Sequence, residues 1–249
     1  MSRRGGARAR ASGLERPSSE LGPRAYDGAM RGEVVRLLEA IGSMDVSALS
    51  AERRSAMAAR WTEHALLEHA SIASFARFSL HLLAVGAPPE LLERTQRAAL
   101  DEIEHARLAF AIAGRLGGEP VGPGPLSMEG DVIGNLDLLS VAVAATEEGC
   151  IGEALAALEA DREAWAEPAG PIADVLASIA RDEATHAELA FAFVRWAARV
   201  GGPPIASAVE ATRHARLGLT TPASRSLAAS WSELLAGTRP VTSLLRASA

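Results

Sequence analysis

The stretch that decides the fold is Asp101–Ala111, "DEIEHARLAFA", because the chain repeats it as Asp182–Ala192, "DEATHAELAFA". The two copies agree at eight of eleven positions. In each copy a glutamate precedes a histidine by one helical turn, as Glu-x-x-His, and residues at positions i and i+3 share one face of a helix. The repeat indicates a duplicated helical hairpin, a site to which both copies contribute, or both.

Both copies place their acid and histidine, Glu102 with His105 and Glu183 with His186, on faces made of small apolar residues. Such faces should point into the core, where a carboxylate or imidazole is costly unless it is paired, hydrogen-bonded or bound to a metal. Two inward pairs would together supply two carboxylates and two imidazoles. The neighbours one or two turns away are Ala98, Ala99, Ala106 and Ala109 in the first copy and Ile179, Ala180, Ala187 and Ala190 in the second.

Each copy also has an inward-facing acid on the helix that precedes it. The spacing from Glu68 to Glu102 differs by a single position from the spacing between Glu148 and Glu183. Nearly equal spacings across two hairpins would bring each acid to a similar depth beside its Glu-x-x-His pair. Glu148 is preferred because its helical face is the more apolar one, but Glu147 remains a competitor for the same role.

Other polar residues near the repeat receive weaker interpretations. Glu153 is kept as a candidate additional ligand, and Asp101 and Asp182 as candidate partners that orient a histidine from behind. Glu104 is expected to be solvated, and Cys150 to be a small core residue rather than a redox thiol. Three further histidines are interpreted as surface or packing residues: His64, His69 and His81.

Composition excludes several classes of function. The 249 residues carry a formal net charge of −6, which gives no reason to expect nucleic acid or an anionic membrane as a partner. All 25 basic residues are Arg, so Schiff-base lysines, Walker A lysines and pyridoxal phosphate enzymes are excluded. Cys150 is the single cysteine, so no disulfide and no paired CxxC site can form within the chain. With no apolar segment of membrane-spanning length and no apolar stretch after the N-terminal arginines, a cytoplasmic location is expected.

The chain is expected to contain three regions. Residues 1–30 are predicted to be a disordered basic tail. Residues 31–202 are predicted to be a helical bundle with an N-terminal extension, whose core covers about 60–200, and residues 203–249 a C-terminal helical extension. The helices are expected over about 32–42, from Ser47 or Ser50 to about 85, and over about 89–116, 136–163 and 171–200.

A Gly/Pro-rich connection separates the two expected hairpins. It has about 18 residues and can span about 60 Å when extended. A 20-residue helix is only about 30 Å long, so the connection can cross a whole bundle. One long crossover is the ferritin-like variant of the four-helix bundle, and the sequence therefore predicts an all-α fold of that kind.

One Glu from each of two helices and a Glu-x-x-His pair from each of two others is the ligand pattern of carboxylate bundles that bind two metals. The chain resembles the ferritin-like superfamily of carboxylate-bridged di-iron proteins over about residues 60–200. The resemblance implies that the Glu-x-x-His glutamates bridge two ions, and that one acid and one histidine cap each ion. The implied metal ligands are Glu68, Glu102, His105, Glu148, Glu183 and His186.

Oxygen and nitrogen ligands without thiolate suit iron or manganese better than structural zinc. The expected function is therefore a di-iron, or Mn/Fe, oxidoreductase that activates O₂ or peroxide and acts on a small-molecule substrate. An external electron donor is expected because the chain lacks the paired CxxC motifs of a rubredoxin domain. A monomer or homodimer fits this function. Two alternatives stay open, namely a ferroxidase or iron-storage protein of ferritin type and a metal-free helical interaction module.

Overall fold

The computed structural model describes residues 32–128 and 132–246, so the expected basic tail lies outside the described residues. Within these ranges every regular element is a helix, which confirms the all-α prediction. No helix in the described part of the chain is long and apolar enough to cross a membrane. The described residues divide into two compact units, one with residues 32–75, 99–128 and 132 and the other with residues 76–98 and 133–246.

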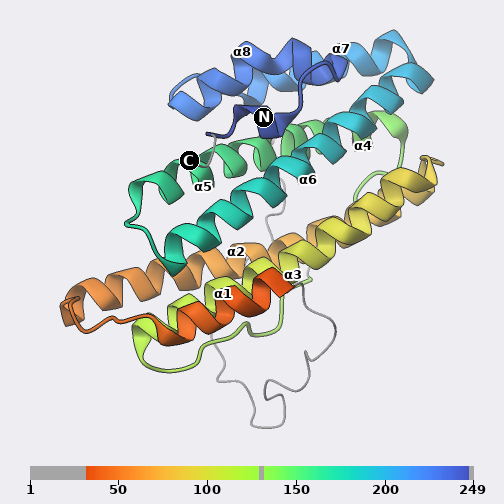
Figure 1. The fold of residues 1–249 in the computed structure, drawn as a ribbon. Coiled ribbons are helices and arrows are strands. Elements are labelled where there is room, and N and C mark those ends of the chain that lie inside the picture. Colours follow the sequence, from red (N-terminus) through yellow and green to blue (C-terminus); the bar gives the residue numbers. More distant parts are fainter. Residues whose placement is uncertain (1–31, 129–131, 247–249) are drawn as a thin grey trace, which may run out of the picture. The chain divides into compact units, whose positions relative to one another are not determined.

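The first unit is built on three helices, α1 (Gly32–Ser43), α2 (Ala51–Ala84) and α3 (Pro89–Gly117) (Figure 1). It contains all of α1 and the parts of α2 and α3 that lie farthest from the turn between them. α1 buries one apolar stripe, Val34, Leu37 and Ile41. Ser50 caps α2, because its Oγ accepts a 3.2 Å hydrogen bond from the backbone N–H of Arg53. Of the two expected caps, the structure therefore selects the later one.

The second unit contains the turn between α2 and α3 and all the later helices. α4 (Leu138–Ala144), η2 (Ala145–Glu153) and α5 (Ala154–Ala166) follow one another without a break. The sequence predicts one helix here, and its extent is confirmed. Its centre differs, because η2 is a nine-residue π-helix. In a π-helix the hydrogen bonds run from i to i+5, so side chains after η2 face other directions than a uniform α-helix would give them.

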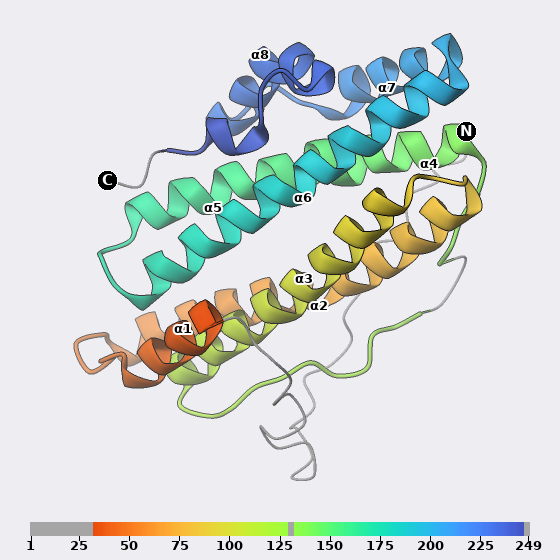
Figure 2. The same ribbon diagram turned by 45° about the vertical axis from the view of Figure 1, so that its right-hand side comes forward.

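α6 (Pro171–Gly201) is the central helix of the second unit, and it starts at the proline expected for its first turn. It forms an antiparallel pair with α5 and also packs against η2 (Figure 2). Its large buried side chains include Phe191 and Phe193, and the ring of Phe193 meets Phe78 edge to face at 5.3 Å. Burial of this apolar face is the main stabilising contribution that places α6.

The C-terminal extension consists of α7 (Pro203–Arg216), α8 (Pro222–Ala236) and the short 3₁₀ turn η3 (Val241–Leu244). α7 packs against α4 and η2, and α8 packs against α5 and α6 (Figure 1, Figure 2). Trp231 of α8 meets the ring of Phe191 edge to face at 5.2 Å. Its indole N–H also donates a 3.0 Å hydrogen bond to the carboxylate of Glu210. The extension is thus a packed part of the second unit.

Gly149 allows η2 to approach α6 closely. A Cβ atom placed on Gly149 would lie 2.4 Å from the Cβ of Ala190, closer than two carbon atoms can pack. Gly152, one turn later in the same π-helix, is exposed, and a Cβ there would have its nearest neighbour at 3.5 Å, an ordinary contact. The close packing of η2 on α6 therefore depends on the missing side chain at position 149.

We expect Gly149→Ala to lower the free energy of unfolding by about 1–3 kcal/mol relative to Gly152→Ala, because overpacking a tight contact forces backbone shifts. Both substitutions gain the same helix propensity of about 0.5–1 kcal/mol, so the difference between them isolates the contact. Urea denaturation of the two variants measures it. Equal stabilities would contradict the close approach of η2 and α6.

Candidate metal centre

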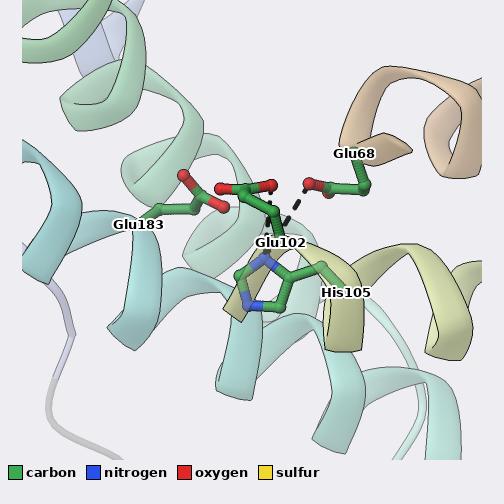
Figure 3. Close-up of side chains that lie close together, drawn as sticks. All are labelled: Glu68, Glu102, His105 and Glu183. Atoms are coloured by element: carbon green, nitrogen blue, oxygen red, sulfur yellow. Dashed lines mark ion pairs between the residues drawn. The ribbon is translucent and has the colours of Figure 1, made fainter. Parts of the chain in front are cut away.

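The first unit contains a buried group of two carboxylates and one imidazole (Figure 3). Glu68 comes from α2, and Glu102 and His105 come from α3. One ligand atom from each of the three lies within 4.8 Å of those from the other two. Glu68 is 8% exposed, and Glu102 and His105 are each 1% exposed. The sequence predicted all three as metal ligands, and the structure brings them together.

The imidazole of His105 lies at nearly equal distances from the two carboxylates. Its Nδ1 atom is 3.8 Å from Oε2 of Glu68 and 3.9 Å from Oε2 of Glu102 (Figure 3). The Glu102–His105 pair lies on one face of α3 because the two residues are three apart. Glu68 reaches the same place from the neighbouring helix. We refer to Glu68, Glu102 and His105 as the first acid–histidine group.

His64 is a further member of this neighbourhood, although the sequence analysis assigned it to surface or packing. Its Nδ1 atom lies 3.0 Å from Oε1 of Glu68, one helical turn away on α2. The ring of Trp61 lies 5.3 Å from the imidazole of His64. His64 is therefore in close contact with the proposed ligand Glu68. The signal in the sequence was the spacing of one helical turn from a proposed ligand.

The second unit contains a matching group of two carboxylates and one imidazole. Glu183 and His186 lie on α6, with Nδ1 of His186 3.5 Å from Oε2 of Glu183. The third member is Glu153, the last residue of η2, and one ligand atom from each of the three lies within 4.8 Å of the others. Glu183 is 4% and His186 2% exposed, while Glu153 is half-buried. We refer to these three residues as the second acid–histidine group.

Glu148, the expected ligand from this helix, lies outside the second acid–histidine group. Its side chain is 55% exposed and forms an ion pair with Arg77. The competitor Glu147 is also directed elsewhere, with its carboxylate 3.2 Å from Arg216. The choice of Glu148 assumed a uniform α-helix throughout, whereas both acids lie in the π-helix. The changed register gives the inward position to Glu153, which was considered only as an additional ligand.

Depth in the hairpin is the sequence signal that favours Glu153. The stretch from Glu153 to the end of α5 at Ala166 is almost as long as the stretch from the start of α6 at Pro171 to Glu183. Because each helical residue rises by the same amount, about 1.5 Å, the two acids lie at nearly the same depth from the turn. Glu148 precedes Glu153 in the same continuous helix and therefore lies farther from the turn. Counting from the turn, rather than comparing spacings between hairpins, favours Glu153 as the acid beside Glu183.

Four other polar residues complete the surroundings. Asp101 and Asp182 are half-buried next to Glu102 and Glu183, and their role in orienting a histidine stays a prediction. Glu104 was expected to be solvated, and this prediction was wrong because the residue is only 9% exposed. Cys150 is fully buried on η2, and this burial raises the pKa of its thiol far above the usual range. This burial agrees with the expected role of Cys150 as a small core residue.

The chemistry of both groups suits a divalent cation with a preference for oxygen and nitrogen. Each group concentrates two carboxylates and one imidazole within 4.8 Å. Two carboxylates that close together in an apolar surrounding repel each other when both are ionised, and a cation between them offsets that repulsion. Carboxylate and imidazole donors suit iron and manganese. The buried groups could thus hold metal ions.

Comparison of the chain with protein-family models, with curated proteins and with solved structures gave no match. The assignment of the site therefore depends on the residues themselves, that is, on their donor atoms, burial and distances.

Glu153→Gln and Glu148→Gln are a matched pair that tests the ligand from η2. We expect Glu153→Gln to weaken iron binding by more than about 10-fold, because loss of a direct ligand costs at least as much as loss of a residue behind it. Glu148→Gln should leave iron binding near the wild-type level. Anaerobic Fe(II) titration followed by elemental analysis measures both, and unchanged helical circular dichroism checks folding. A reversed order of the two variants would restore Glu148 as the ligand.

Proposed function

We propose that this chain is a di-iron, or Mn/Fe, oxidoreductase that activates O₂ or peroxide to oxidise a small organic substrate. One observation carries the proposal. Each of the two units contains a buried acid–histidine group whose ligand atoms lie within 4.8 Å of one another. Two buried groups of the same composition, each with two carboxylates and one imidazole, fit a pair of metal ions that prefer oxygen and nitrogen ligands.

In this proposal the two acid–histidine groups form one dinuclear centre. The support is the sequence repeat, in which each copy supplies the same Glu-x-x-His pair. The six side chains include four carboxylates, whose four negative charges offset two divalent cations. As in the ferritin-like proteins that the chain resembles, Glu102 and Glu183 would bridge the ions. The other ligands would cap one ion each, and Glu153 would take the place first expected for Glu148.

The protein's own contribution is a rigid and dry setting for the ligands. Buried alanines lie within one or two helical turns of both Glu-x-x-His pairs, so each pair lies on a helix face that is closed to solvent. His64, with its Nδ1 atom 3.0 Å from the Glu68 carboxylate, would help to orient this ligand. When bound, the metal ions would supply the redox chemistry that acts on O₂ or peroxide. The residues around the pairs are Ala98, Ala106 and Ala109 on α3 and Ala180, Ala184 and Ala187 on α6.

Aerobic iron titration separates this enzyme from the alternatives. We expect rapid oxidation of Fe(II) by O₂ that saturates at about two ions per chain, because a dinuclear centre has two places to fill. An external reductant should then restart O₂ consumption. Absorbance of the ferric product and an oxygen electrode measure the two quantities.

The double variant Glu102→Gln/Glu183→Gln should abolish saturable oxidation, because both proposed bridging ligands are lost, while Glu93→Gln on the exposed face of α3 should have no effect. Oxidation that continues far beyond two ions per chain, with growth of a mineral, would favour iron storage. Absence of iron binding in the wild-type chain would leave the metal-free interaction module.

A further inference from the structure

The first unit has a groove of about 820 Å³, within the range of about 300–1,000 Å³ that small-molecule pockets occupy. It is lined by α1, by α2, by the C-terminal half of α3 and by the segment 118–123. Its floor is apolar and well packed, since Ile41 is 1%, Ala106 6% and Phe110 7% exposed. We refer to it as the α1 groove. A concave apolar groove of this size fits a small organic molecule better than it fits the flat surface of a protein partner.

Small residues on α3 leave the α1 groove open. Ala111 and Gly114 line it where larger side chains would fill it. A Cβ atom on Gly114 would lie 3.2 Å from the carbonyl oxygen of Glu119, so the glycine also allows the segment 118–123 to approach α3. The segment forms one wall, with Val121 among the lining residues. The groove is thus formed by sequence features of α3 and of the segment that follows it.

The α1 groove is adjacent to the first acid–histidine group along two helices. His69 directly follows Glu68 in α2, and Ile103 and Ala106 directly follow Glu102 and His105 in α3. Successive residues of an α-helix point about 100° apart, because about 3.6 residues complete a turn. The groove and the ligands therefore occupy neighbouring faces of the same two helices.

The lining favours an apolar occupant that carries one polar group. Its charged side chains are Arg107, Arg115 and Glu119, of which Arg115 and Glu119 are exposed. The Nε atom of Arg115 donates a 2.8 Å hydrogen bond to the carbonyl of Met44, so this guanidinium is occupied in holding the end of α1. His69 also lines the groove. Its imidazole can form a hydrogen bond with a hydroxyl or carbonyl group of the occupant.

We propose that the α1 groove binds the substrate of the reaction, and that this substrate is a predominantly apolar organic molecule with a hydroxyl or carbonyl group directed at His69. The substrate role rests on the proposed oxidoreductase function. The binding role does not, since the groove is complete in a single unit without any metal.

The test uses the full chain and the uncharged dye Nile red, whose fluorescence rises in apolar surroundings. We expect saturable binding of about one dye per chain, because one groove of this size accommodates one such molecule. 1-Hexanol, 1-octanol and 1-decanol should displace the dye with affinities that increase about threefold to fourfold per added methylene. Glycerol should not displace it. Displacement that is independent of chain length would overturn the proposed substrate class.

Two matched substitutions locate the binding. Ala111→Phe, which fills the α1 groove, should weaken dye binding at least about tenfold by removing the space for the dye. Ala59→Phe, on the exposed surface of α2 and away from the lining, should leave it unchanged. If Ala111→Phe does not fold, Val121→Trp narrows the same groove from its other wall. Wild-type affinity in the folded groove variants would overturn the proposal.

Iron content and the rate of Fe(II) oxidation separate this inference from the proposed function. If the chain binds iron but dye binding does not depend on the groove, the proposed binding role of the groove is overturned and the proposed function is not. Dye binding without iron binding overturns the oxidoreductase, and with it the substrate role. With both present, saturating 1-decanol should change the rate of Fe(II) oxidation by O₂ at least about threefold, because the groove adjoins the ligands. The same addition should have no effect on Ala111→Phe, and an unchanged rate in the wild type would overturn the substrate role.

Discussion

The structure depends on the cost of placing carboxylates and imidazoles inside a helical protein. Glu102 and His105 are 1% exposed, and Glu183 and His186 are 4% and 2% exposed. Charged groups this deep cost several kcal/mol each unless their surroundings offset the charge. Each unit gathers two acids and one histidine whose ligand atoms lie within 4.8 Å, an arrangement that a bound cation would stabilise. The small residues around them follow from the same constraint, because close helix packing keeps water away from the group.

The π-helix η2 shows how backbone geometry selects a ligand. The nine residues Ala145–Glu153 carry three acids, and all three could face inward in some helical register. In the structure Glu147 and Glu148 form ion pairs with arginines, whereas Glu153 lies beside Glu183 and His186. π-Helical turns are frequent at functional sites because they reorient side chains without ending the helix. Gly149 contributes to the same geometry by allowing η2 to pack closely on α6.

Much of the fold could be predicted from the sequence because helix signals are local. Ser50 directly precedes α2 and Pro171 is the first residue of α6, and both agree with the expected helix starts. Five of the six predicted ligands lie in the two acid–histidine groups, because a Glu-x-x-His pair keeps its face in any regular α-helix. Glu148 could not be excluded as a ligand from the sequence, since a π-helix leaves no clear signature in the amino-acid composition. His64 was assigned to surface or packing although it lies one helical turn from Glu68. The α1 groove was missed because it depends on contacts between separate segments.

The central claim is that the two acid–histidine groups form one dinuclear centre rather than two independent sites. Mössbauer spectroscopy of the full chain, loaded anaerobically with ⁵⁷Fe(II) and oxidised with O₂, tests it most directly. The account predicts about two irons per chain, present as one antiferromagnetically coupled ferric pair whose spectrum shows no magnetic splitting at low temperature in a weak field. Magnetically split spectra of isolated high-spin ferric ions, at one or two per chain, would contradict it.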